Sequence, residues 1–192
     1  NTVMKKIFFT RKLIKKSEEY ASSIFKVKFN IDDILLSKEE IISQSNDCDG
    51  IISTVTEVFD DDVISKLSNT IKIISNFGVG FSNIDTIAAN KRNIIVTNTP
   101  DVLTAATAEI AFLIILGAAR RATEGINYAR NKNWRWSSSF LIGKELHNAR
   151  LGILGMGRIG RAVANRARSF GMTIRYHNRV RLDSNLEKES TY

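Results

Sequence analysis

The sequence predicts an α/β fold in which parallel strands are covered by helices on both faces. Two observations lead to this prediction. Short apolar runs alternate with amphipathic segments along the first hundred residues, which is the order of β-α-β units. A glycine-rich turn at residues 155–160 then joins another apolar run to another helical pattern. At 192 residues, 43% hydrophobic and 25% charged, the chain suits one large or two smaller globular domains.

The first hundred residues contain four strand patterns and four helix patterns. We expect strands at 7–10, 51–54, 71–75 and 94–97. Helix patterns cover 12–25, about three turns around residues 63–67, and 84–92. Ser37 and Glu40 are spaced as a capping box, in which each side chain satisfies a backbone donor of the other residue, so a further helix should start there.

Pro100, the only proline, marks a boundary. Proline disfavours helix for the residue before it and has no N–H to donate. We therefore expect one domain over residues 1–100 and a second over 101–192. The segment from Thr104 to about Arg121 predicts a long helix that is apolar nearly all round, which is typical of a helix buried on several sides between two domains.

Residues 127–141 are polar and are interpreted as an arm or loop. Trp134 and Trp136 in this arm fit either a subunit interface or local aromatic packing. Residues 1–3 precede Met4, which has the look of a natural start, and they receive no structural role.

The segment from Arg150 to Arg161 has an apolar strand, a glycine turn and the start of a helix. Gly155, Gly157 and Gly160 form the G-x-G-x-x-G pattern of dinucleotide-binding proteins. Gly155 allows the tight turn, Gly157 lets the backbone approach a pyrophosphate, and Gly160 lets the helix pack on the strand. The unpaired N–H groups and the positive end of the helix dipole attract phosphates.

The helix after this turn has an apolar face that we assign to the core. Gly171 follows at the position of a C-cap, and 172–176 is expected to be the next strand.

Charge is distributed unevenly along the chain. The formal net charge is +8, but residues 116–182 alone carry +12 and the remainder −4. A nucleic-acid surface is one interpretation. We favour solvated arginines with anion sites for a phosphate-bearing cofactor, because no basic motif interleaved with aromatic residues is present.

Cysteine usage and hydropathy argue against a disulfide-bonded, a secreted or a membrane-spanning protein. Cys48 is the single cysteine, so the sequence offers no disulfide and no cysteine metal cluster, which fits a reducing cytoplasm. The apolar stretch at 7–9 is too short for a signal peptide. The longest apolar stretch, 110–119, is too short to span a bilayer.

Three stretches together resemble the D-isomer-specific 2-hydroxyacid dehydrogenase family, from about Lys5 to the end of the chain. The first stretch is Asn76-Phe77-Gly78-Val79-Gly80-Phe81-Ser82-Asn83-Ile84-Asp85. The second covers residues 96–109 and continues to residues 119–121. The third covers residues 152–160 and is followed by residues 170–172. The sequence Tyr176-His177-Asn178-Arg179 is most similar to the glyoxylate/hydroxypyruvate reductases. Ser82 departs from the family, which usually has Asp there.

The resemblance implies a flavodoxin-like parallel-sheet substrate domain, followed by the first part of a Rossmann dinucleotide-binding domain. The backbone N–H groups of Val79 and Gly80 would hold the substrate carboxylate, with Gly78 permitting the loop conformation, as successive backbone donors do in anion sites. Thr104 would lie near the cofactor phosphates, although a plain helix N-cap looks the same in sequence.

Gly157, Arg158, Ile159 and Gly160 would line the pyrophosphate. An NAD site has Asp or Glu about 20 residues beyond the glycines. Here the sequence has Asn178, Arg179 and Arg181. Since arginine pairs with a 2′-phosphate that a carboxylate would repel, we expect NADP to be preferred, with NAD possible.

The family reduces a 2-oxo acid at C2 by hydride transfer, using an Arg, a His and a Glu. These belong to motifs beyond the second Rossmann strand, so we expect an N-terminal fragment without turnover of its own. Neither His147 nor His177 matches the position of the catalytic histidine, and we assign no catalytic residue. We expect a homodimer of a small-molecule enzyme that binds neither nucleic acid, membrane nor metal. The alternative is a dinucleotide-sensing, corepressor-like binding protein.

Overall fold

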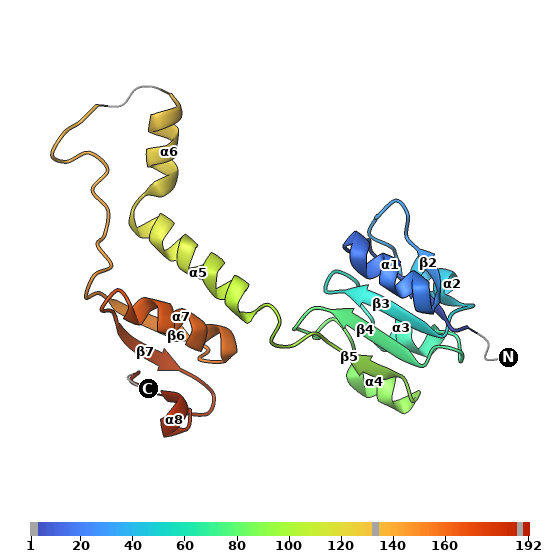
Figure 1. Cartoon of the computed structure of the whole chain (residues 1–192). Helices are drawn as coiled ribbons and strands as arrows, with labels where there is room; N and C mark the ends of the chain where they lie inside the picture. Colours follow the sequence, from blue (N-terminus) through green and yellow to red (C-terminus); the bar gives the residue numbers. More distant parts are fainter. Residues whose placement is uncertain (1–3, 132–134, 188–189) are drawn as a thin grey trace. The chain divides into compact units, whose positions relative to one another are not determined.

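The computed structural model describes residues 4–131, 135–187 and 190–192. The chain divides into two compact units, Asn1–Pro100 and Asp101–Tyr192. Each unit is built on a parallel sheet with helices packed against it (Figure 1). The α/β class expected from the alternation of strand and helix patterns is therefore confirmed.

The first unit contains a five-stranded sheet in the order β2-β1-β3-β4-β5, with every neighbouring pair parallel. This is the flavodoxin-like strand order. The strands are β1 (Lys6–Phe9), β2 (Lys26–Phe29), β3 (Gly50–Thr54), β4 (Ile73–Phe77) and β5 (Ile95–Thr97). The helices are α1 (Lys15–Ile24), α2 (Lys38–Ser45), α3 (Asp61–Lys66) and α4 (Thr86–Lys91).

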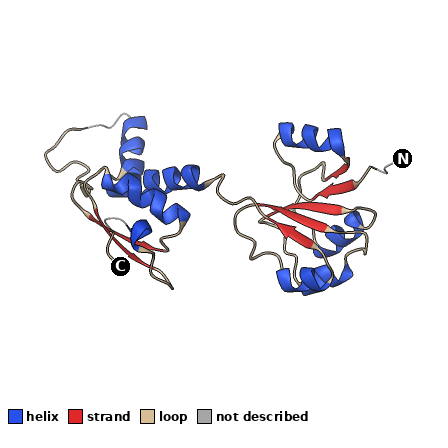
Figure 2. Ribbon diagram, turned by 60° about the horizontal axis from the view of Figure 1, so that its bottom comes forward, coloured by secondary structure: helices blue, strands red, loops and turns tan. Residues whose placement is uncertain are grey.

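Helices cover both faces of this sheet (Figure 2). On one face, α2, α3 and α4 bury residues such as Ile41, Val63 and Ala89 against the strands. On the other face, α1 buries Ala21 against Ile7 and Phe9 of the first strand. The sheet is thus an apolar layer with a core on each side, as parallel sheets require.

Local sequence explains where the helices of this unit begin. Ser37 caps α2 in the predicted capping box, with Glu40 closing it. The carboxylates of Asp60 and Asp85 cap α3 and α4 in the same way, because each accepts hydrogen bonds from first-turn N–H groups.

The first unit differs from the prediction in one missed strand, one shorter helix and one shifted strand. The edge strand β2 was missed, because its sequence Lys-Val-Lys-Phe carries only two apolar residues. Helix α3 has six residues and not three turns, because Leu67 leaves the helix with ψ of 149°. Strand β4 starts at Ile73, and it extends through Asn76 to Phe77.

Cys48 lies in the core of the first unit. Burial, and next the Asp47 carboxylate, raises the pKa of the Cys48 thiol to about 11. The thiol is therefore protonated near neutral pH and has no nucleophilic role.

In the second unit, the described residues form a two-stranded parallel sheet and four helices. The strands are β6 (Arg150–Leu154) and β7 (Thr173–His177). The helices are α5 (Thr104–Ala119), α6 (Ala122–Arg130), α7 (Arg158–Arg168) and α8 (Ser184–Glu187). Helix α7 connects the two strands and packs between them and α5, so that Phe112, Val163 and Ile174 share one core. Gly171 has φ of +67° beyond the end of α7, as expected of a helix-terminating glycine.

The long helix predicted over 104–121 is interrupted. Arg121 has φ of +53°, so α5 ends there and α6 begins in a new direction. The first residues of the predicted arm, 127–130, are consequently helical, whereas 135–149 are irregular. Trp134 lies outside the described residues, and Trp136 is exposed.

Within the second unit, helix α5 buries only Ala108 and Phe112, and both face α7. The expected burial of this helix between the two domains stays a prediction. Ile110, Leu113 and Ile114 are more than half exposed. The helix is apolar nearly all round, as predicted, but such a helix does not reveal in its sequence which face packs against the rest of the unit.

In the described part of the chain, no helix has both the length and the apolar character needed to cross a membrane. The same ranges contain no group of acidic, histidine and cysteine side chains arranged to hold a metal ion.

Candidate functional site

The glycine turn lies in a β-to-α crossover, between β6 and α7. Gly155 has φ of +98°, and its N–H donates to the carbonyl of His177 at 2.9 Å. A Cβ on Gly160 would lie 2.3 Å from the Gly155 carbonyl oxygen, so this glycine allows the helix to approach the strand. A Cβ on Gly157 would meet nothing within 4 Å, which leaves open space beside the turn.

The N-terminus of α7 is open to a ligand. Gly157 is its N-cap, and no side chain caps this end. First-turn N–H groups, here those of Arg158, Ile159 and Gly160, have no partner within a helix. The N–H of Met156 just before them donates to Asn178 Oδ1 at 2.6 Å, which ties the end of β7 to the turn. The Ile159 side chain packs partly into the core, so it can contribute only its backbone.

A groove of about 520 Å³ lies at the carboxyl ends of β6 and β7. It brings four of the predicted residues together, namely Gly155, Gly157, Asn178 and Arg179. Carboxyl ends of parallel strands are where α/β proteins bind their ligands.

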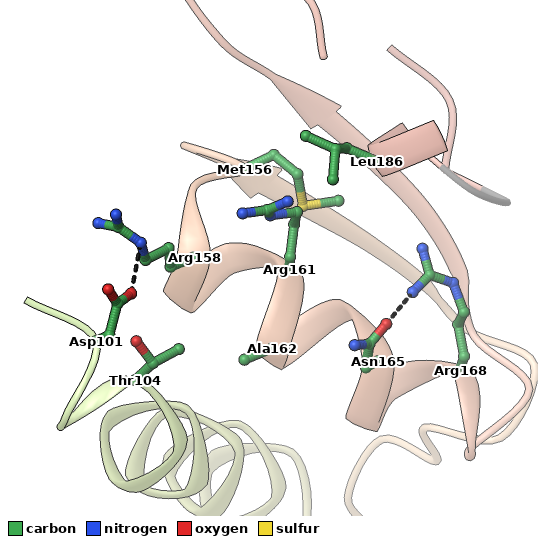
Figure 3. A pocket seen from close by; sticks show the side chains of 9 residues that line it. All are labelled: Asp101, Thr104, Met156, Arg158, Arg161, Ala162, Asn165, Arg168 and Leu186. Carbon is green, nitrogen blue, oxygen red and sulfur yellow. Dashed lines mark hydrogen bonds and ion pairs between the residues drawn. The ribbon is translucent and has the colours of Figure 1, made fainter. Parts of the chain in front are cut away.

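Thr104 and Arg158 line a second pocket beside α7, of about 470 Å³ (Figure 3). Arg158 Nε lies 2.6 Å from Asp101 Oδ1, and both side chains are more than half exposed. The N-cap of α5 is Leu103, without a side-chain hydrogen bond, and Thr104 is the first helical residue. The interpretation of Thr104 as a plain N-cap is therefore wrong.

Arg181 is held apart from both cavities. Its guanidinium donates to both carboxylate oxygens of Glu187, at 2.9 and 3.1 Å, and stacks over the ring of Tyr192. Arg181, and then the Tyr176 hydroxyl, hold the pKa of the Glu187 carboxyl below its usual range. Arg179, in contrast, is exposed and lines the groove.

The loop Gly78–Gly80 follows β4 in the first unit. The Gly78 N–H donates to the Asn76 carbonyl at 2.9 Å. Within the described ranges, no protein acceptor is recorded for the N–H groups of Val79 and Gly80. Two successive backbone donors are thus available on one turn, as an anion site requires.

Gly78 is needed for space. Its φ is not in the left-handed region, which among the described glycines only Gly155 and Gly171 adopt. A Cβ on Gly78 would lie 2.5 Å from Val55 Cγ1. The small size of the residue therefore lets the loop pack against the turn after β3.

Two buried polar side chains, one just after β3 and one on β4, were not identified from the sequence. Glu57 is 1% exposed, and its carboxylate accepts hydrogen bonds from the Thr10, Thr54 and Thr56 hydroxyls and from the Thr54 N–H. Asn76 is 0% exposed, and its Nδ2 donates to Asn83 Oδ1 at 3.3 Å. Asn83 Nδ2 donates in turn to the Glu57 carbonyl at 2.9 Å. The one available signal was that polar residues end several apolar strand patterns.

A family model described as the D-isomer specific 2-hydroxyacid dehydrogenase catalytic domain matches residues 7–184. The chain belongs to this family. It is 38% identical over 186 residues to a glyoxylate reductase of Korarchaeum cryptofilum, covering 96% of this chain and 55% of that protein. It is 39% identical over 184 residues to a glycerate dehydrogenase of Hyphomicrobium methylovorum, covering 95% and 57%.

Solved structures show the same fold. A protein described as a D-isomer specific 2-hydroxyacid dehydrogenase from Polaromonas sp. JS6 66 has a TM-score of 0.91 and 40% identity, over 99% of this chain and 60% of that one. The NADPH-dependent glyoxylate/hydroxypyruvate reductase of Sinorhizobium meliloti, in complex with NADP and malonate, has a TM-score of 0.83 and 27% identity, over 99% and 57%. The chain thus spans somewhat more than half the length of these relatives.

Proposed function

We propose that this chain belongs to an NADP(H)-dependent reductase that converts a small 2-oxo acid, such as glyoxylate or hydroxypyruvate, to its D-2-hydroxy acid. The observation that carries the proposal is the open crossover between β6 and α7, with Asn178 and Arg179 beside it. The curated relatives include glyoxylate reductases and a glycerate dehydrogenase, which supports this substrate class.

The crossover fits a dinucleotide. The first-turn N–H groups of α7 would bind its pyrophosphate, and the space at Gly157 would admit it. Arg158 and Thr104 border the neighbouring pocket from the α7 and α5 sides. When bound, the nicotinamide cofactor supplies the hydride. The contribution of this chain is to hold the cofactor phosphates and, at Val79 and Gly80, to orient the substrate carboxylate.

The preference for NADP follows from the residues at the end of β7. Asn178 stands where a ribose-binding carboxylate would be expected, and its amide side chain carries no negative charge. Its Oδ1 accepts a hydrogen bond from the Met156 N–H. Arg179 in the same groove would pair with a 2′-phosphate. Arg181 would contribute less than expected to binding the 2′-phosphate, because its charge is paired with the Glu187 carboxylate.

The test is the affinity of the chain for NADPH and NADH, measured by nucleotide fluorescence. We expect the wild type to favour NADPH by about tenfold or more, and Arg179→Ala to remove the preference. Arg150→Ala is the matched control, since Arg150 is an exposed arginine at the opposite end of β6. Equal affinities of the wild type for both nucleotides would contradict the assignment.

We also propose a homodimer that buries the exposed face of α5. Ile110, Leu113 and Ile114 give this helix an apolar surface that water contacts directly. Leu113→Glu is expected to shift the chain from dimer to monomer in sedimentation velocity experiments, while Lys91→Glu on α4 should not. A wild-type chain that sediments as a monomer at all concentrations would rule out this interface.

A further inference from the structure

We infer that Asn98 is a positioning residue that aligns the Gly80 N–H for the substrate carboxylate, and that Asn76 anchors the same loop from β4. The inference rests on the proposed substrate site. Its basis is that each carbonyl of the Gly78–Gly80 loop is held by a donor from elsewhere in the first unit.

Peptide planarity links these carbonyls to the N–H groups. In a trans peptide, the C=O of one residue and the N–H of the next lie in one plane and point in opposite directions. No cis peptide bond occurs in the described chain. A donor that fixes the carbonyl of Val79 therefore fixes the direction of the Gly80 N–H as well.

The segment after β5 supplies two of the three donors. Asn98 Nδ2 donates to the Val79 carbonyl at 2.8 Å, which directs the Gly80 N–H away from Asn98. The Thr99 N–H donates to the Gly78 carbonyl at 2.9 Å and directs the Val79 N–H in the same manner. The directions of the Val79 and Gly80 N–H groups are thus fixed by the adjacent residues Thr99 and Asn98. Pro100, which comes next, restricts the backbone of Thr99.

Asn76 supplies the third donor from a fully buried position. Its Nδ2 donates to the Gly80 carbonyl at 2.8 Å, and its Oδ1 accepts from the Ser53 hydroxyl at 3.1 Å. Asn83, just beyond the loop, donates to the carbonyls of Thr54 and Glu57 at 3.1 and 2.9 Å. The loop is held at its exit as well as along its length.

Asn98 allows the clearer test, since it is only half-buried and its loss leaves the core intact. The variants are Asn98→Ala and Asn98→Leu, the second of which keeps a branched side chain but cannot donate. Asn90→Ala is the control, because Asn90 is exposed on α4 and no side-chain hydrogen bond is recorded for it. The ¹⁵N-labelled 192-residue chain is titrated with glycolate as the carboxylate probe.

In both Asn98 variants we expect the order parameter of the Gly80 N–H to fall from about 0.85 to below about 0.6 in the absence of ligand. We expect the dissociation constant for glycolate to rise about three- to tenfold, because the Gly80 N–H is no longer held in line with the carboxylate and one hydrogen bond to glycolate is weakened. NADPH affinity and the amide shifts of the sheet should be unchanged, which a general loss of structure would not allow.

Each adverse result has a distinct meaning. Unchanged Gly80 order and glycolate affinity in Asn98→Ala would overturn the inference, and wild-type behaviour of Asn98→Leu alone would show that packing, not donation, holds the loop. If glycolate shifts neither Val79 nor Gly80 in the wild type, the proposed substrate site fails. In that case the order parameters still decide whether Asn98 positions the loop.

Discussion

Gly160→Ala should weaken both the fold of the second unit and its binding of dinucleotide. The new Cβ would lie 2.3 Å from the carbonyl oxygen of Gly155 and 3.2 Å from its carbonyl carbon. Both are backbone atoms of the turn, so no side-chain rotation relieves the contact. Helix α7 would have to move away from β6, and overpacking of this kind costs about 1–3 kcal/mol or more.

The measurement is urea unfolding followed by NADPH titration of the folded variant. Gly157→Ala is the matched control, because its Cβ meets nothing within 4 Å and its φ of −75° suits alanine. We expect this control to keep its stability within about 1 kcal/mol, the scale of an N-cap change. It should still lose NADPH affinity, since the Cβ occupies the space through which a pyrophosphate approaches the backbone.

Two results would contradict this account. A Gly160→Ala chain with the unfolding midpoint of the wild type would show that the close approach of helix to strand is not required. Unchanged NADPH affinity in Gly157→Ala would show that the open space at the turn is not the phosphate site.

Gly78→Ala should disturb the carboxylate site in the first unit. The added Cβ would lie 2.5 Å from Val55 Cγ1, so the Val55 side chain, the loop or the turn after β3 must shift. Because the N–H groups of Val79 and Gly80 belong to that loop, we expect glycolate affinity to fall about tenfold, which corresponds to about 1.4 kcal/mol.

A double-mutant cycle identifies the cause. Val55→Ala removes the obstructing methyl group, so the double variant with Gly78→Ala should recover most of the lost affinity. Gly80→Ala provides a comparison for stability, as its Cβ would meet no atom within 4 Å. If the double variant binds glycolate no better than Gly78→Ala alone, the contact with Val55 is not what makes glycine necessary there.

Short-range patterns were sufficient for much of the fold. The capping box at Ser37, the crossover at residues 150–177 and the parallel character of the sheet were all predicted. Each depends on residues a few positions apart, or on a repeat of two or 3.6 residues, and both are visible in the chain itself. The family assignment likewise depends on motifs that are continuous in sequence.

The sequence alone did not reveal which side chains meet. Arg179 and Arg181 look equivalent in sequence. Among the residues that the structure describes, an acidic partner is found for Arg181 and not for Arg179, and this carboxylate comes from α8. The apolar run of α5 gave no indication of which face packs against α7, nor that the helix breaks at Arg121.

The amino-acid sequence by itself determined the α/β class, the glycine crossover and the family of this protein, but not the strand β2 or the helices α6 and α8. Tertiary structure alone decided that Asn76 and Asn98 hold the Gly78–Gly80 loop and that the Glu57 side chain is buried. The physical reason is the separation along the chain over which each interaction acts. Glycine constraints and amphipathic periods act between near neighbours, whereas a hydrogen bond from Asn98 to Val79, 19 residues away, exists only once β4 and β5 lie side by side.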